Sequence, residues 1–326
     1  AEYVFLEEME MVSVILLFVL GLVLICFGGD KLVDASVALA RKIGIPQIVV
    51  GATIVSIGTT LPEILVSTTA AFDGSAAISA GNAFGSIICN TALIAGLTQL
   101  LRPVKKVEFG SLAWRSLFFF ATILALTAYG WFTGHFDRMA GIVLLVLFGV
   151  YAWLNMVRSK SEEEETAETE ESLEELKKIS LPRNLMLLAF CAVLLFWGAN
   201  LLVDNGIIIA GYLGVPERVI AVTAIALGTS LPELVTSIMS VVKGCENVGL
   251  GNIIGANILN LLLVIGIPAT VTGIELEAQT VRVDAPLGAL VMAVLIVPIL
   301  FRKKASRIQG AALLAVYGLY CAFNFF

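Results

Sequence analysis

The chain has 326 residues, of which 59% are hydrophobic and 14% are charged, whereas about 25% of the residues of soluble domains are charged. Apolar stretches of roughly 20 residues, long enough to cross a bilayer, recur along the chain. A soluble domain of this length has too little interior to bury them, so that class is excluded. The net charge of −6 does not indicate a charged partner, because nine glutamates lie in one short segment.

Breaks in the hydropathy pattern divide the chain into ten predicted membrane-spanning helices. The predicted spans are 11–43, 46–72, 77–101, 111–133, 139–157, 184–213, 216–243, 247–272, 281–301 and 307–325. The first and the sixth are longer than a bilayer requires, so we expect them to tilt or bend. The predicted fold class is therefore an all-α integral membrane protein of ten transmembrane helices.

A polar, glutamate-rich segment at 158–181 separates the fifth span from the sixth. Its low hydrophobicity and high charge predict a solvated hinge, disordered or partly helical. A regulatory cation site there is the weaker interpretation, because scattered glutamates without turn geometry do not form a cage. The predicted domains are a first five-helix half at 1–157, this acidic loop, and a second five-helix half at 182–326.

The distribution of basic residues predicts the orientation in the membrane. Loops on the side of the acidic segment hold fifteen lysines and arginines and the opposite loops hold three, leaving out Lys31 and Arg115, which lie within spans. We therefore predict a multi-pass protein of the cell membrane with the 158–181 loop in the cytoplasm and both termini outside.

The sequence carries few groups for enzymatic or cofactor chemistry. The five cysteines are irregularly spaced in or beside apolar segments, which predicts buried thiols, and the single histidine, His135, lies in a short connection. There is no HExxH or GxSxG motif. We expect no enzyme activity, no cofactor and no nucleic-acid partner.

The two halves of the chain resemble each other. With a shift of 170 residues, IGTTLPEI at 57–64 falls on LGTSLPEL at 227–234, and GN at 81–82 falls on GN at 251–252. Chance apolar similarity does not explain a polar motif repeated inside two membrane spans. Because each half holds five spans, an odd number, equivalent helices must cross in opposite directions. This predicts inverted repeats, in which substrate sites lie near the midplane on broken helices.

Glu63 and Glu233 occupy equivalent positions in the middle of predicted spans. An ionisable group at membrane depth costs about 3 kcal/mol on insertion scales, so two matched carboxylates indicate a function. The alternative is a pair of protonated, hydrogen-bonded core carboxyls. Pro62 and Pro232 lack an N–H group, so the glycine carbonyls four residues earlier lose their helical partners and the core helices should be discontinuous.

Each motif offers a carboxylate, hydroxyl groups and exposed carbonyls within one turn. Thr59 and Thr229 each lie four residues before a glutamate, on the same helical face. Such oxygen ligands suit hard cations, and Ca²⁺ takes about 6–8 of them. Two glutamates balance one Ca²⁺, or share Na⁺ or H⁺ instead. With no histidine or cysteine nearby in sequence, zinc and copper are disfavoured.

A second repeated motif is GNAFGSIICN at 81–90, paired with GNIIGANILN at 251–260. Its glycines, four residues apart, predict close helix packing. Ser86 and Asn90 share one helical face. In the second half Asn260 is equivalent to Asn90, but the residue equivalent to Ser86 is Ala256.

Four charged residues that follow the first and sixth apolar stretches are predicted to have an interfacial or helix-capping role, with ion coordination as the weaker alternative. They are Asp30, Lys31, Asp34 and Asp204.

The paired motifs resemble the alpha repeats of the sodium/calcium exchanger family, within the cation/calcium exchanger superfamily, and the chain is similar to its compact prokaryotic-type members. The alpha-1 motif would occupy 51–97 and the alpha-2 motif 221–267. The resemblance covers nearly the whole chain. It implies electrogenic Na⁺/Ca²⁺ antiport by alternating access, with both ions as substrates, in a protein that we expect to be a monomer.

The resemblance also implies a ligand set. The Ca²⁺ ligands would be Glu63, Glu233, Thr59 and Thr229. The residues at Na⁺ sites or around a central water would be Ser56, Thr60, Ser86, Asn90, Ala226 (through its carbonyl), Ser230 and Asn260.

The chain departs from the family pattern at two positions. Ala256 replaces the usual serine, so one Na⁺ site loses a side-chain ligand, and Asn260 replaces the aspartate of potassium-dependent members, which argues against potassium co-transport. The acidic loop is too short for the calcium-sensing domains of animal exchangers.

Two other functions compete with Na⁺/Ca²⁺ antiport. A Ca²⁺/H⁺ antiporter on the same scaffold is the nearest alternative, because glutamates bind protons and Ala256 weakens a Na⁺ site. A cation channel is less well supported, because repeated carboxylates at the midplane are typical of transporters. In either antiporter, the long first and sixth spans are expected to slide against the core and switch access.

Overall fold

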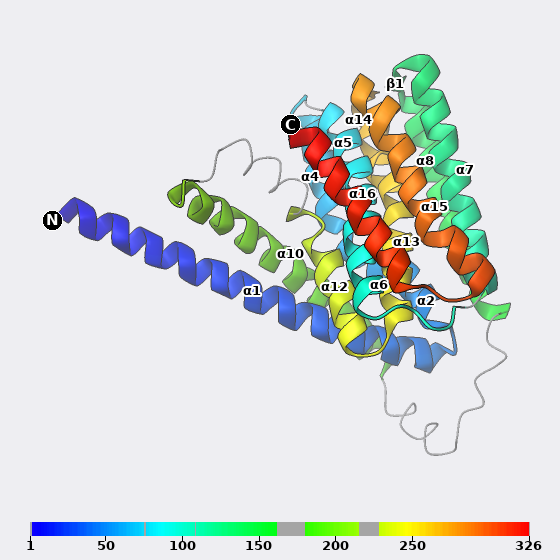
Figure 1. Cartoon of the computed structure of the whole chain (residues 1–326), viewed down its shortest axis with the longest axis horizontal. Coiled ribbons are helices and arrows are strands. Elements are labelled where there is room, and N and C mark those ends of the chain that lie inside the picture. Colours follow the sequence, from blue (N-terminus) through cyan, green and yellow to red (C-terminus); the bar gives the residue numbers. More distant parts are fainter. Residues whose placement is uncertain (1, 75, 108, 162–179, 215–227, 326) are drawn as a thin grey trace.

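The computed structural model describes residues 2–74, 76–107, 109–161, 180–214 and 228–325. These residues are almost entirely helical (Figure 1). Seven of the helices are long and apolar enough to cross a membrane, or eight if one bent pair counts as a single span. Two shorter apolar helices, Leu231–Val242 and Arg307–Phe323, also occur among the described residues. The prediction of an all-helical membrane protein is therefore confirmed.

The two longest helices pack against each other along one side of the bundle. They are α1 (Glu2–Ile43) and α10 (Leu181–Tyr212), and Figure 1 shows them side by side, at an angle to the remaining helices. Gly21 and Gly198 lie at their crossing. A Cβ atom on Gly198 would lie 2.8 Å from the backbone nitrogen of Ile25 and 2.9 Å from the carbonyl oxygen of Gly21. Only glycine allows this backbone approach.

The predicted second span is broken, at the position that Pro62 indicates. It consists of α2 (Gln47–Val50), the π-helical segment η1 (Gly51–Val55), α3 (Ser56–Thr59) and α4 (Leu61–Phe72). The chain bends by 43° at Thr60, between α3 and α4. In the second half, α12 (Leu231–Val242) likewise begins just before a proline. Residues 215–227, upstream of it, lie outside the described residues.

The predicted third and eighth spans each contain a π-helical segment. The third is α5 (Ala77–Ile88), η2 (Cys89–Ala95) and α6 (Gly96–Leu101). The eighth is α13 (Glu246–Leu259), η3 (Asn260–Val264) and α14 (Gly266–Thr272). Because π-helical segments leave the regular hydrogen-bonding ladder, they often occur at functional sites. Asn90 and Asn260, equivalent in the repeat, lie at the start of the two segments.

Helix α13 crosses the broken span at close range. A Cβ atom on Gly255 would lie 2.6 Å from the Cα atom of Ala52, and Gly251 faces the backbone of Ile48 in the same way. The predicted packing role is therefore confirmed for these two glycines. It stays a prediction for Gly81 and Gly85.

The remaining helices complete the bundle (Figure 1). They are α7 (Phe109–Thr133), α8 (Arg138–Ser161), the π-helical segment η4 (Thr280–Asp284), α15 (Ala285–Arg302) and α16 (Arg307–Phe325). Strand β1 (His135–Phe136), which contains the single histidine, pairs antiparallel with β2 (Ile274–Glu275). Helix α8 extends into the predicted acidic loop as far as Ser161, and 162–179 lie outside the described residues.

Candidate functional site

Glu63 and Glu233 lie in the first turns of α4 and α12, and both side chains are fully buried. The N-terminus of a helix carries partial positive charge and unpaired N–H groups, which favour a carboxylate in the first turn. Because α4 and α12 begin inside the bundle, these helix ends support two charges at depth. The two carboxyl groups are close enough to interact electrostatically. The structure thus brings together the two residues that the repeat singled out.

Each carboxyl group is flanked by hydroxyls from the opposite half of the chain. Thr59 and Thr60 lie beside the Glu233 carboxyl group, and the Thr60 hydroxyl donates a 3.3 Å hydrogen bond to its Oε1 atom. Thr229 and Ser230 lie beside the Glu63 carboxyl group in the equivalent arrangement. The two repeated motifs therefore form one polar centre rather than two.

Several buried oxygen atoms in this centre have no hydrogen-bond donor among the described residues. They include both carboxylate oxygens of Glu63, Oε2 of Glu233 and Oγ of Ser230. Because a buried polar atom without a partner is costly, a cluster of them needs a further partner. The oxygen donor set is one that a hard cation would satisfy.

The other predicted ligands also lie in buried positions. The Ser56 hydroxyl donates a 3.0 Å hydrogen bond to the Thr53 carbonyl oxygen, and Ser86 is buried. Asn90 donates to the Oδ1 atom of Asn257, 3.3 Å away, while its own Oδ1 and both polar side-chain atoms of Asn260 have no hydrogen-bond partner among the described residues.

Two residues bear on the predicted Na⁺ sites. Ala226 lies outside the described residues, so its predicted carbonyl ligand stays a prediction. Ala256 is fully buried and supplies no side-chain oxygen.

The structure adds residues that the sequence analysis missed. Asn82 and Asn252 accept hydrogen bonds from the two threonines of the site, and Asn257 bonds to Asn90 and Thr91. The GN pair common to both halves was a signal for the first two. No such signal existed for Cys89, whose thiol lies beside Ser230. Among the described residues, no group of three or more histidine, cysteine or acidic side chains forms a metal cluster.

A separate charged cluster links α1 to the C-terminal end of α12. The Lys243 ammonium lies 2.7 Å from Oδ1 of Asp30 and 2.5 Å from Oδ1 of Asp34, and Lys31 joins the same two acids. Because α1 continues to Ile43, these residues do not cap a helix, and Asp204 likewise lies within α10. The capping interpretation is therefore wrong for all four residues, since their helices continue past them.

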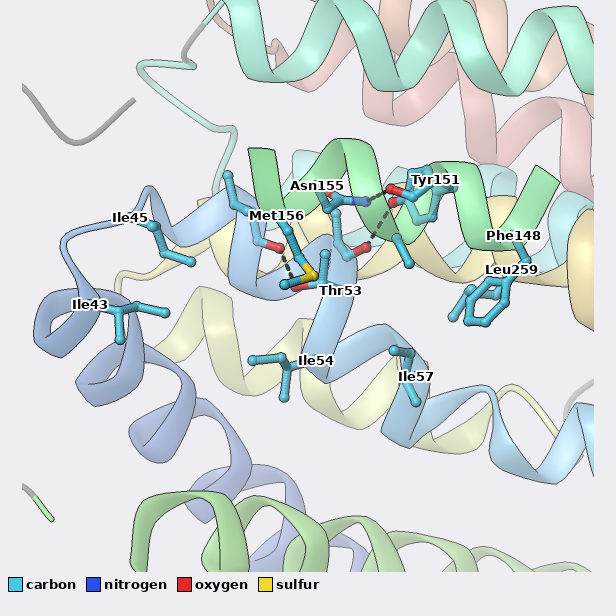
Figure 2. Close-up of a pocket in the computed structure, with 13 residues that line it drawn as sticks. Ile43, Ile45, Thr53, Ile54, Ile57, Phe148, Tyr151, Asn155, Met156 and Leu259 are labelled. Carbon is cyan, nitrogen blue, oxygen red and sulfur yellow. Dashed lines mark hydrogen bonds between the residues drawn. The ribbon is translucent and has the colours of Figure 1, made fainter. Parts of the chain in front are cut away.

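An apolar cavity of about 430 Å³ lies behind the broken span, between α1, α8 and the η1–α3 segment (Figure 2). Its wall is formed largely by Ile43, Ile45, Ile54, Ile57, Phe148 and Met156. The Tyr151 hydroxyl donates a 2.9 Å hydrogen bond to the Ala52 carbonyl within η1, which satisfies a polar group of the π-helical segment. No carboxylate lines this cavity, so it is distinct from the polar centre.

Comparison with known proteins identifies the family. The family described as "Sodium/calcium exchanger protein" matches residues 13–157 and 183–326, which lie within the two predicted halves and leave out the acidic loop. The chain belongs to the sodium/calcium exchanger family. It is thus a transporter of a cation/Ca²⁺ antiporter family, embedded in a membrane, and the family is not one of enzymes.

Relatives of this exchanger align along nearly their full length. Inner membrane protein YrbG of Escherichia coli is 34% identical over 307 residues, covering 93% of each chain. The sodium/calcium exchanger MaX1 of Methanosarcina acetivorans is 27% identical, over 95% of this chain and 98% of its own. A solved structure of the sodium-calcium exchanger NCX_Mj superposes with a TM-score of 0.80 at 30% identity, covering 96% of this chain and 99% of that one. The resemblance to a compact prokaryotic member is confirmed.

Proposed function

We propose that the protein is a Na⁺/Ca²⁺ antiporter of the cell membrane that works by alternating access. The observation that carries the proposal is the pair of buried carboxyl groups, Glu63 and Glu233, each in the first turn of a helix that begins inside the bundle. Together they balance the charge of one Ca²⁺ ion. MaX1 and NCX_Mj, both named as sodium/calcium exchangers, support the choice of ions.

The Ca²⁺ ion would be held by the two glutamates together with oxygens of Thr59 and Thr229. The flanking Na⁺ ions would use the hydroxyls of Ser56, Thr60, Ser86 and Ser230 and the Ala226 carbonyl, with Asn90 and Asn260 near the centre. Because both kinds of ion would depend on the same two carboxyl groups, one full load excludes the other. Exchange is then obligatory.

The transport scaffold would be ten spans in two inverted five-helix repeats. The support is the 170-residue repeat, together with the reciprocal placement of Thr59 beside Glu233 and Thr229 beside Glu63. The excess of basic residues on one side supports an orientation with the 158–181 loop in the cytoplasm and both termini outside. One chain contains both halves of the site, so a monomer suffices.

A flux assay in reconstituted vesicles tests the choice of counter-ion. Vesicles loaded with Na⁺ and diluted into Na⁺-free buffer should take up Ca²⁺ with pH clamped on both sides, and should generate a membrane potential. Vesicles with equal Na⁺ on both sides are the control. Equal Ca²⁺ uptake with and without the Na⁺ gradient would overturn the proposal.

A Ca²⁺/H⁺ antiporter on the same scaffold is favoured by one observation. Ala256 is fully buried where its counterpart Ser86 supplies a hydroxyl, so one candidate Na⁺ site lacks a side-chain ligand. In that case, uptake in the same vesicles would follow an imposed pH gradient and not a Na⁺ gradient.

A further inference from the structure

Two buried asparagines lie between the halves of the candidate site. Asn252, on α13, accepts a 3.1 Å hydrogen bond through its Oδ1 atom from the hydroxyl of Thr59. Asn82, on α5, accepts the equivalent bond from the hydroxyl of Thr229, at 3.5 Å. Asn252 is fully buried and Asn82 is 8% exposed. Each asparagine thus contacts a predicted Ca²⁺ ligand of the opposite half.

The direction of these bonds matters because a hydroxyl has one proton and two lone pairs. Thr229 lies beside the carboxyl group of Glu63, which is the strongest acceptor in its surroundings. Asn82 nevertheless offers this hydroxyl an acceptor at 3.5 Å, and neither Glu63 carboxylate oxygen has a hydrogen-bond donor within 3.5 Å among the described residues. The hydroxyl oxygen and the carboxylate therefore both keep lone pairs available for a cation.

The amide of Asn82 is held in the orientation that this requires. Its Nδ2 atom donates a 2.9 Å hydrogen bond to the Ser67 hydroxyl and a 3.4 Å bond to the Glu63 carbonyl oxygen. With its nitrogen tied to α4, its oxygen faces Thr229. A flipped amide would place its oxygen against the Glu63 carbonyl oxygen, acceptor against acceptor, so the network defines the orientation.

Thr59 has two other acceptors close by, the Ser56 carbonyl oxygen and the Glu233 carboxyl group. The Ser56 carbonyl oxygen lies 3.4 Å from its hydroxyl, one helical turn earlier, and Asn252 is nearer at 3.1 Å. Loss of the amide oxygen would release the proton toward Ser56 or toward the Glu233 carboxyl group, beside which Thr59 also lies. A bond to Glu233 would occupy a lone pair of its carboxylate, and a bond to Ser56 would rotate the Thr59 hydroxyl away from its present position.

We propose that Asn82 and Asn252 are positioning residues, which hold the hydroxyl protons of Thr229 and Thr59 away from the transported cation. The inference rests on the proposed function, since it assumes that a cation binds at the two glutamates. It assigns each asparagine a ligand on the opposite half, so that cation affinity depends on contact between the halves.

A double-mutant cycle on Asn252 and Thr59 tests the proposal. Asn252→Leu keeps the branching of the side chain and removes the acceptor. It is expected to raise the Ca²⁺ concentration for half-maximal uptake by up to about tenfold, the range for one buried hydrogen bond. In the Thr59→Val background, where there is no hydroxyl to orient, the same substitution should add less than about twofold. Full additivity would overturn the proposal, because it would mean that Asn252 acts only through packing.

The matched control is Asn184→Leu. Asn184 is also a buried asparagine, but it donates a 2.8 Å hydrogen bond to the Ala35 carbonyl oxygen, away from the glutamates. It should leave the Ca²⁺ dependence unchanged while reporting the effect of losing a buried amide. An equal loss of affinity in this variant would also overturn the proposal.

The equivalent cycle of Asn82→Leu with Thr229→Val is used if the Asn252 variant does not fold, as judged by size-exclusion chromatography. The two proposals fail in different ways. If the unmodified protein neither transports nor binds Ca²⁺, the proposed function fails. If it does transport Ca²⁺ but both cycles are additive, only the role of the asparagines fails.

Discussion

The two halves of the chain place the same motif in similar local structure but complete it differently. In the first half, Asn82 is anchored by Ser67. Their counterparts Asn252 and Ser237 have, at Nδ2 and Oγ, no hydrogen-bond partner among the described residues. Among the described residues, the first half therefore ties its asparagine to α4 through Ser67, and the second half has no equivalent bond.

The halves also differ in how their long helix is attached. Lys243, after α12, binds Asp34 of α1. At the shift of 170 residues, the counterparts of these two residues are Asp73 and Asp204, both acidic. The equivalent ion pair is therefore impossible in the other half. If α1 and α10 move against the core, only α1 has to break this ion pair.

The largest expected effect comes from removing one charge of the glutamate pair. Glu63→Gln or Glu233→Gln should each lower Ca²⁺ uptake by about 100-fold or more, because a single buried carboxylate cannot balance a divalent ion. Uptake into vesicles measures this, with Glu275→Gln, an exposed residue on β2, as the control. Folding should be nearly intact. Normal uptake in either variant would refute the assignment of the site.

Cross-linking α1 to the core should have the next largest effect. A reducible thiol-reactive cross-linker about as long as a lysine side chain, joining Asp34→Cys to Lys243→Cys, would fix the contact that the native side chains make at 2.5 Å. If α1 slides during transport, cross-linking should lower uptake by about tenfold or more and reduction of the linker should restore it, because turnover would then require this motion. The Asp34→Cys single variant controls for modification by the reagent. Undiminished transport by the cross-linked protein would exclude sliding of α1.

The glycine crossing of α1 and α10 predicts a loss of stability. Gly198→Ala places a methyl group 2.8 Å from the Ile25 nitrogen, so the helices must separate, at a cost of about 1–3 kcal/mol in unfolding free energy. Thermal unfolding in detergent measures the change. Gly211→Ala on the same helix meets no atom within 4 Å among the described residues, and should be neutral or slightly stabilising because alanine favours helix. Equal behaviour of the two variants would contradict the close crossing.

The smallest expected effect concerns the position where the halves differ by one hydroxyl. Ala256→Ser should raise the apparent Na⁺ affinity several-fold, within the range of one hydrogen-bonding group, and Ser86→Ala should lower it. The Na⁺ dependence of Ca²⁺ uptake measures both changes. An unchanged Na⁺ dependence in Ala256→Ser would show that the missing hydroxyl does not matter.

Much of the site was predictable because its signals are local. Pro62 and Pro232 predicted where helices break, since a proline removes a backbone donor wherever the chain lies. Glu63 and Glu233 stood out because a carboxylate inside an apolar span is unfavourable without a function. The repeat indicated that the two would meet, and both are buried where the two motifs come together.

Contacts between distant segments could not be predicted from the sequence. Nothing in the spacing of Asn82 indicates that it accepts a proton from Thr229, or that Cys89 lies beside Ser230. In the sequence, Lys243 was only one of the basic loop residues, but in the fold it forms an ion pair with Asp30 of α1. Sequence periodicity shows which face of a helix is polar, but the partner of that face depends on how all the helices pack.

The sequence by itself thus determined that the chain spans a membrane, that the second span breaks at Pro62 and that two carboxylates occupy matching positions in apolar spans, because composition, proline and buried charge act through local physics. Only the tertiary structure decided which hydroxyl faces which amide and which long helix is tied to the core. Those pairings arise from backbone approach at residues such as Gly198 and Gly255, where packing geometry and not residue chemistry selects the neighbour.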